Sequence, residues 1–175
     1  DGVSYVGGVL GGTGKTDYYE ITRTSVKGEI IASNSYSGGF VGAAQADVEQ
    51  VLSNCISSAS VTLTGTGKQI GGIVGTATSK ITITNCIATG NLKTNTVAGG
   101  IIGRVGFADS KVSNCIAWNA DLTANTASLV GAVIGSLEKN GEYASCVRRA
   151  DMVVNGTSVA VADQDDITTV AATTA

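Results

Sequence analysis

The chain has 175 residues, of which 43% are hydrophobic and 14% are charged, and its formal net charge is −3. This composition supports one folded domain with a core of its own and argues against a disordered chain. A small negative charge without a basic cluster is poorly suited to binding phosphates, so we expect no nucleic-acid partner.

Two further classes of protein are excluded by what the chain lacks. It contains no histidine, so no catalytic triad that uses this residue can form. No stretch reaches the roughly 20 apolar residues of a transmembrane helix, and the longest apolar stretch, residues 129–137, is interrupted by Gly131 and Gly135. We therefore expect no membrane span in this segment, and we interpret residues 129–137 as a buried strand.

A short glycine-apolar cassette, Gly-Gly-apolar-apolar-Gly, recurs along the chain. Its copies are residues 7–11, 38–42, 71–75, 99–103 and, with alanine as the second residue, 131–135. The copies start 31, 33, 28 and 32 residues apart, and a period of this size is typical of repeat proteins whose units pack on their neighbours. The sequence therefore predicts five repeats.

A second landmark, a turn that contains a cysteine, follows every cassette except the first. It reads Ser/Thr-Asn-Cys-Ile three times and Ser-Cys-Val once, and it contains all four cysteines of the chain, Cys55, Cys86, Cys115 and Cys146. Asparagine tolerates a left-handed backbone and bonds to nearby backbone groups, which suits a corner. We expect Asn54, Asn85 and Asn114 to form a stacked ladder there, with a plain polar surface turn as the alternative.

The spacing of the cysteines argues against a metal or redox site. They lie 31, 29 and 31 residues apart, without the close C-x-x-C pairs of such sites, so we expect no metal and no cofactor. Stacked one strand spacing apart, about 4.8 Å, they would be buried thiols that act as small hydrophobic side chains. Disulfides such as Cys55–Cys86 with Cys115–Cys146 are the alternative, because that separation lies within the Cα range of a disulfide.

Short β-like runs separated by Gly, Ser, Asn and Thr fill each repeat, and no apolar period of helical length is present. Three strands and three corners in about 31 residues suit one coil of a parallel β-helix. We predict an all-β, single-stranded parallel β-helix of about five coils, right-handed by the crossover preference. A β-prism of antiparallel three-stranded units is the alternative.

The two ends of the chain differ from the repeats between them. We assign residues 1–154 to the five-repeat solenoid and residues 155–175 to a C-terminal partial coil or cap. Only residues 1–4 precede the first β-like run, so we expect an unpaired edge at the first repeat, covered by preceding chain or by a binding partner.

Few side chains suggest chemistry. The carboxylates Asp47 and Glu49, and those at residues 163–166, are close in sequence and are expected to be solvated surface groups. Trp118, the single tryptophan, occupies a position that is polar in the other repeats, Ser58, Thr89 and Arg149. It is therefore expected to point outward, where it would contact a sugar or a protein ligand, or to pack over a neighbouring corner.

The cassettes and the Asn-Cys-Ile-Ala turns together resemble the GLUG-type repeats of bacterial surface proteins, including adhesin-like proteins of Bacteroidetes. The resemblance covers residues 5–154 and departs from the pattern at Ala132 and in the first repeat, which lacks the cysteine. It implies a non-catalytic structural or adhesive module, extracellular or at the cell surface, that presents loops to host protein or glycan.

The same resemblance implies that this segment is part of a longer chain whose leader lies outside it. A polysaccharide-cleaving β-helix enzyme is the alternative function, with Asp47 or Asp165 as the carboxylates to test. The absence of a catalytic constellation favours the non-catalytic module.

Overall fold

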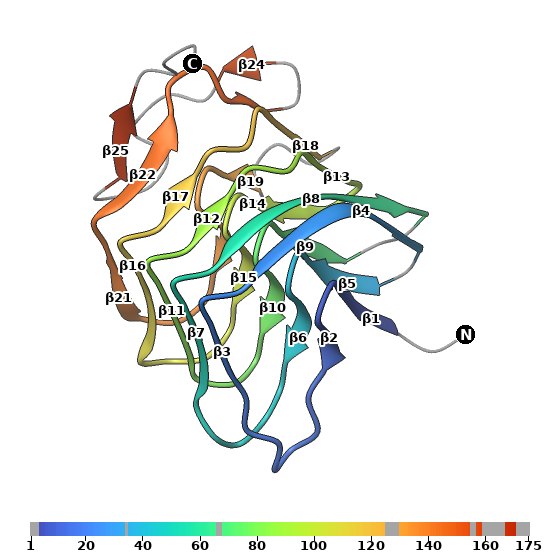
Figure 1. Cartoon of the computed structure of the whole chain (residues 1–175), viewed down its shortest axis with the longest axis vertical. Helices are drawn as coiled ribbons and strands as arrows, with labels where there is room; N and C mark the ends of the chain where they lie inside the picture. The colour runs from blue at the N-terminus through green and yellow to red at the C-terminus, as the bar shows by residue number, and fades with distance from the viewer. Residues whose placement is uncertain are drawn as a thin grey trace.

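The computed structural model consists of about five stacked coils of parallel β-strands (Figure 1). It describes residues 4–33, 35–65, 68–124, 130–154, 157–158 and 167–170. Each coil passes through four sheets, which we call A to D, and within each sheet the strands of successive coils lie side by side. The parallel β-solenoid predicted from the sequence is confirmed, and the antiparallel β-prism is wrong; the handedness stays a prediction.

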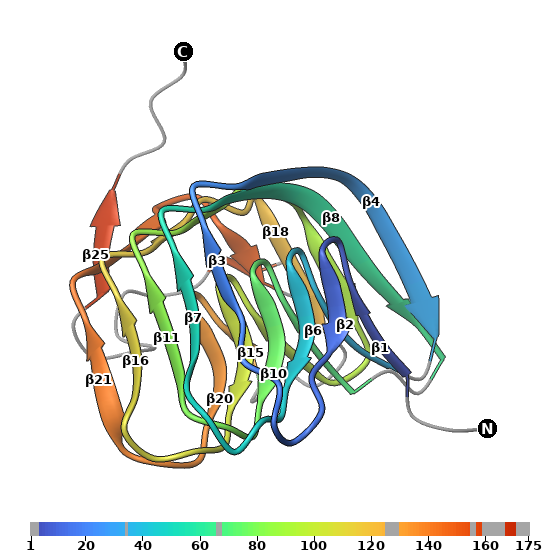
Figure 2. The same ribbon diagram turned by 60° about the horizontal axis from the view of Figure 1, so that its bottom comes forward.

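Sheets A and B are formed by the residues on the two sides of each cassette. Sheet A contains β1 (Ser4–Gly7), β5 (Ser35–Gly38), β9 (Gln69–Gly71), β14 (Val97–Gly99) and β19 (Val130–Gly131). Sheet B contains β2 (Leu10–Gly12), β6 (Val41–Ala44), β10 (Val74–Ala77), β15 (Ile102–Val105) and β20 (Ile134–Leu137). Figure 2 shows the strands of sheet B in a row beside those of sheet C.

Sheets C and D meet at the Asn-Cys corner. Sheet C contains β3 (Glu20–Thr22), β7 (Gln50–Ser53), β11 (Ile81–Thr84), β16 (Ser110–Ser113) and β21 (Gly141–Ala144). Sheet D contains β4 (Ser25–Ser33), β8 (Ile56–Thr64), β12 (Ile87–Ala88), β13 (Leu92–Thr94), β17 (Ile116–Ala117), β18 (Asp121–Ala124), β22 (Cys146–Arg149), β23 (Val153–Val154), β24 (Thr157–Ser158) and β25 (Ile167–Val170).

The predicted count of three strands per coil is wrong, because the cassette is a tight turn between two strands. In the fifth repeat, residues 129–137 were expected to form one buried strand, but β19 ends at Gly131 and β20 begins at Ile134. The glycines permit this turn, since they let sheets A and B pack closely: a Cβ on Gly42 would lie 2.5 Å from the Gly11 oxygen and the Val6 nitrogen. The run is apolar because the turn is buried.

The core is built from columns, meaning residues at equivalent positions of successive coils. At the tip of the cassette turn, Phe40, Ile73 and Ile101 are fully buried, and they are spaced by one coil because Val41, Val74 and Ile102 pair in register beside them. Like residues thus pack on like residues, as expected when coils repeat.

The region at 155–175 is described only at two strands. Strand β25 pairs parallel with β22, and β24 pairs antiparallel with β23. The division at residue 154 stays a prediction, and Asp163, Asp165 and Asp166 lie outside the described residues. In the described part of the chain, no helix has the length and apolarity needed to cross a membrane.

Candidate functional site

The outer surface of sheet D carries a column of apolar side chains beside the cysteine corner. Directly after each cysteine, Ile56, Ile87, Ile116 and Val147 stack on one another in register. Because side chains alternate between the two faces of a strand, the buried cysteine points inward and the next residue points outward. We call these four residues the isoleucine ribbon.

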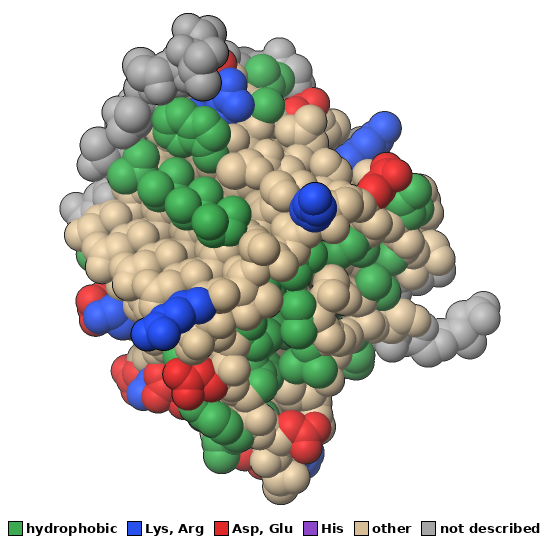
Figure 3. All heavy atoms as spheres, in the orientation of Figure 1, with side chains coloured by type: hydrophobic (Ala, Val, Ile, Leu, Met, Phe, Trp, Pro, Cys, Tyr) green, Lys and Arg blue, Asp and Glu red, His purple; other side chains and the backbone are tan. Residues whose placement is uncertain are grey.

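The isoleucine ribbon is accessible along its length. Ile56 is 46% exposed, and the other three side chains are partly exposed. Figure 3 shows hydrophobic side chains gathered as a band over the strands of this sheet, bordered mainly by backbone and by side chains that are neither hydrophobic nor charged. A contiguous apolar band on a protein surface is a recognised sign of an interaction site, unlike scattered single residues.

Trp118 lies on the same outer face, two residues beyond Ile116. Its backbone N–H donates to the Ala88 oxygen at 2.7 Å. Trp118 therefore lies in one column with Thr89 and Arg149, the polar residues with which the sequence aligns it. The Arg149 guanidinium lies over its ring, 5.9 Å from the centroid. The side chain is partly exposed, so the ring lies beside the isoleucine ribbon, on the side away from the Asn-Cys corners.

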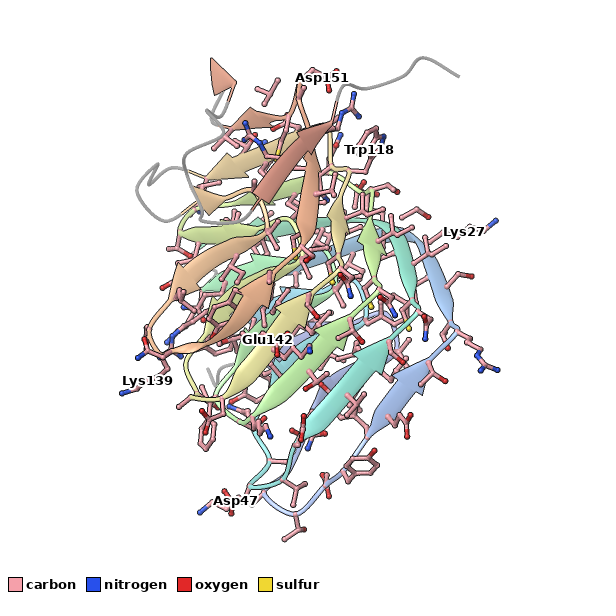
Figure 4. All side chains as sticks on the ribbon, turned by 90° about the vertical axis from the view of Figure 1, so that its left-hand side faces the viewer. Lys27, Asp47, Trp118, Lys139, Glu142 and Asp151 are labelled. Carbon is pink, nitrogen blue, oxygen red and sulfur yellow. The ribbon has the colours of Figure 1, made fainter. Side chains whose placement is uncertain are left out.

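An ion pair borders Trp118 on the C-terminal side. Arg149 Nε and the second guanidinium nitrogen Nη2 donate to the two oxygens of Asp151 at 2.7 and 2.8 Å. This hydrogen bonding lowers the pKa of Asp151 and raises that of Arg149. Figure 4 shows Trp118 and Asp151 at the same end of the molecule. The aromatic ring is thus next to a fixed, bidentate polar group that can accept further hydrogen bonds.

The Asn-Cys corners lie along one edge of this face and have a left-handed backbone. Asn54, Asn85 and Asn114 have φ of 56°, 54° and 54°, and Ser145 has 56°. The Asn85 side-chain amide donates to the Asn54 oxygen at 3.3 Å. The asparagines predicted to form a ladder therefore lie at stacked corners, with one hydrogen bond joining the first two.

The four cysteines form a column just inside these corners, and all four are free thiols. Each thiol donates to the backbone oxygen two residues earlier, for example Cys86 to Thr84 at 3.3 Å. Burial raises the pKa of Cys55, and hydrogen bonds with Cys146 and Cys86 raise that of Cys115. The column is a structural part of the core, and among the described residues no group of His, Cys, Asp or Glu side chains could hold a metal ion.

The first coil has an equivalent of the cysteine that sequence comparison missed. The Thr24 hydroxyl donates to the Thr22 oxygen at 2.8 Å, and Ile56 donates to the Thr24 oxygen. Threonine thus makes the bond that the thiols make elsewhere. Only the strand register, in which Ser25 pairs with Ile56, aligns Thr24 with Cys55.

A shallow hollow of about 660 Å³ opens on the outer face of sheet C. It is lined by Glu49, Lys80, Thr82, Asp109, Lys111, Asn140, Gly141 and Glu142. Two acidic groups in it are paired with lysines, Glu49 with Lys80 at 3.2 Å and Glu142 with Lys111 at 2.7 Å. A hydrogen bond from Thr82 lowers the pKa of Glu49. The hollow is thus lined mainly by charged surface side chains that form ion pairs with one another.

The carboxylates suggested by the sequence do not converge there. Asp47 lies in the exposed loop between β6 and β7, away from Glu142 in Figure 4, and its N–H donates to the Lys15 oxygen. Asp47 also does not line the hollow, whereas Glu49 does. The structure therefore places Trp118 beside the isoleucine ribbon. It does not bring Asp47 and Glu49 together in one site.

The isoleucine ribbon was the feature that sequence reasoning missed. Its residues belong to the Asn-Cys-Ile repeat, which by itself indicates a turn and not a surface. The available signal was the alternation itself: if the cysteine is buried, the strand residue after it faces solvent. An apolar residue at that place in four consecutive repeats then indicates an exposed apolar column.

Comparison with known proteins found one similarity. A family model described as the GLUG motif matches residues 66–93, and the described part of this range extends through β9, β10, β11, β12 and the start of β13. The match is therefore about one full coil, and the GLUG-type repeat is supported by it. No curated protein and no solved structure matches the chain.

Proposed function

We propose that this chain is a non-catalytic structural and adhesive module that binds host protein or glycan through the outer face of sheet D. The observation that carries the proposal is the isoleucine ribbon, an exposed apolar column with Trp118 beside it on the same face. A regular sheet holds these side chains at a fixed spacing of about 4.8 Å per coil. Such a flat, rigid face can contact an extended ligand with little loss of conformational entropy.

Trp118 and the Arg149–Asp151 pair favour a ligand that has both apolar and polar faces. An aromatic ring supplies stacking area, and the neighbouring ion pair supplies fixed hydrogen-bonding groups. A sugar ring or an extended peptide has this combination. We place the module at the surface of a bacterial cell or in a secreted protein, as the GLUG-type repeat favours, within a longer chain of adhesin type.

The test is a binding screen of the 175-residue chain on glycan arrays and immobilised matrix proteins, followed by variants. We expect Trp118→Ala and Ile87→Lys to weaken any detected interaction at least about tenfold, since central aromatic and apolar contacts dominate binding energy. Val51→Lys is the matched control, because Val51 points outward from sheet C. Binding that survives both sheet D changes would contradict the proposed surface.

Catalysis is tested separately, on polysaccharides with neutral and uronic sugars. We expect no release of product, because Glu49 and Glu142 are each paired with a lysine. Turnover that disappeared in Asp109→Asn or Glu142→Gln would overturn the non-catalytic proposal. It would place the reaction in the hollow on sheet C.

A further inference from the structure

Within the described residues, the outer end of the first coil is not covered by another coil. Val9 is at the tip of the first cassette, in the column of Phe40 and Ile73, yet it is 51% exposed while they are fully buried. Val26 and Ile30, on the inward face of β4, are also only partly buried. Among the described residues, no strand pairs with the outer edge of β1, β2, β3 or β4. This end therefore exposes both apolar side chains and strand edges.

Strand β4 is the longest of these edges, and its free backbone groups can be assigned. The Ile56 N–H donates to the Thr24 oxygen, and in a parallel pair the residues facing the partner alternate with those facing away. Val26, Gly28 and Ile30 therefore direct their backbone groups toward β8. Lys27, Glu29 and the other odd-numbered residues of β4 direct theirs toward the open side, where another strand could pair.

We propose that two copies of this chain associate end to end, with β4 of one copy antiparallel to β4 of the second and Gly28 at the two-fold axis. A symmetric pair of identical strands must be antiparallel, because a two-fold rotation reverses the direction of the strand. Opposite residues must also share a face of the sheet, which permits only registers that place odd opposite odd and even opposite even.

Charge selects one of these registers. Centred on Gly28, Lys27 lies opposite Glu29 of the second copy, and Val26 lies opposite Ile30. Centred one residue earlier or later, Lys27 or Glu29 lies opposite itself, and like charges directly opposite one another are unfavourable. Lys27 and Glu29 are both exposed and form no ion pair within the described residues. Lys27 projects away from the body of the protein in Figure 4.

The backbone and the core agree with the same register. Lys27 and Glu29 both present free backbone groups, so they would form the hydrogen-bonded pairs that flank the axis. Gly28 would form the closer, non-hydrogen-bonded pair at the axis, where the absence of a Cβ removes steric conflict. Its φ is 124°, and nothing lies within 4 Å of the place where a Cβ would be. The pairing would also bring Val26 and Ile30 of the two copies together.

The experiment is sedimentation velocity on the whole 175-residue chain across a micromolar concentration series. We expect a monomer–dimer equilibrium for the wild type. Lys27→Glu and Glu29→Lys alone should each weaken the dimer about tenfold or more, because two attractive pairs become two repulsive ones. An equimolar mixture of the two variants should dimerise again, since every 27–29 contact then joins opposite charges.

The mixture distinguishes this register from any other mode of association. Lys93→Glu is the control, because Lys93 points outward from the same sheet in a middle coil, and it should leave the dimer unchanged. Circular dichroism checks that each variant is folded. A wild type that stays monomeric, a dimer insensitive to Lys27→Glu, or a mixture that fails to restore association would each overturn the proposal.

Discussion

Tyr19 combines an apolar ring that packs on the core with a hydroxyl that is buried there. It packs against the core directly before β3, and its buried hydroxyl has no hydrogen-bond partner among the described residues. Burial raises its pKa, because the phenolate would lose its hydration. A buried hydroxyl without a partner also costs free energy in the neutral form.

We expect Tyr19→Phe to leave stability at pH 7 unchanged or to raise it by up to about 1 kcal/mol. Since the pKa in the folded state is raised, the contribution of this group is present below the unfolded value, about 10, and is lost as the pH rises above it. Denaturant unfolding at neutral and alkaline pH measures this. The wild type should lose stability above pH about 10 more steeply than the variant.

Tyr18→Phe is the control for this prediction. Tyr18 is 60% exposed and its hydroxyl donates to Glu20 at 3.3 Å, so its loss should change the alkaline slope less. Equal slopes for the wild type and Tyr19→Phe would show that Tyr19 does not contribute.

For single residues, the sequence predicts the backbone conformation at the corners better than it predicts side-chain hydrogen bonds. Asparagine before cysteine indicated a left-handed backbone, and Asn54, Asn85 and Asn114 have one. Arg23 has φ of 49° at the same corner of the first coil, which its residue type did not indicate. Hydrogen bonds such as that from the Gln45 side chain to the Tyr5 hydroxyl depend on which residues of adjacent coils meet, and single residues carry no signal for that.

The element that defines the coil is the glycine-apolar cassette. Its second glycine touches both the next coil and sheet D: a Cβ on Gly72 would collide with the Gly100 oxygen and lie 2.5 Å from the Ala88 Cβ. Both neighbours are parts of stacked coils that cannot move independently. This glycine is therefore required for close packing and not for a left-handed backbone.

We expect Gly72→Ala to lower the free energy of unfolding by about 3 kcal/mol, and Gly72→Val with Gly100→Val to prevent folding, because overpacking shifts the backbone of adjacent coils. Gly106→Ala is the control, since a Cβ there would be 3.3 Å from its nearest neighbours. Thermal and denaturant unfolding measure the differences. A Gly72→Val/Gly100→Val double variant that melted like the wild type would contradict the packing described.

The sequence predicted the recurrence of this element but not its shape. An apolar run of four or five residues is compatible with a buried strand or with another buried segment, since its periodicity does not distinguish them. The same ambiguity conceals the fourth sheet, because the strands that flank one cassette read in the sequence as a single strand. Ala132, which replaces the second glycine in the fifth copy, is buried beside Val133.

On the scale of the whole molecule, stability is shared between neighbouring coils. Equivalent residues pair in register along the axis, as Gly38, Gly71 and Gly99 do in sheet A. Each coil therefore packs mainly on the one before and the one after it. For this reason the number of coils could be predicted from the number of repeats in the sequence. Prediction of the isoleucine ribbon would also have required knowledge of which strand residues point inward and which point outward.

Removal of one whole coil should therefore preserve the fold. Deletion of residues 69–96 joins Lys68 to Val97, which pairs with Gln69 in the intact protein, so every column stays in register. We expect a soluble β protein with a cooperative but lower melting temperature, because one set of coil interfaces is lost. Circular dichroism and light scattering measure this.

A deletion of half that length provides the contrast. Removal of residues 69–82 would connect the end of sheet D to the middle of sheet C, and columns of unlike residues would meet. We expect this variant to aggregate or to remain unfolded. If it folded as well as the variant that lacks a complete coil, register along the axis would not be what holds the coils together.

The direction of the strand pairing also determines how the molecule would respond to a mechanical load. Backbone hydrogen bonds in all four sheets run along the solenoid axis, and the first and last coils are at opposite ends of it (Figure 2). A pulling force applied to the two ends would act along these bonds and open them one after another. The chain should therefore yield by peeling off single turns at modest force, and extend stepwise under tension.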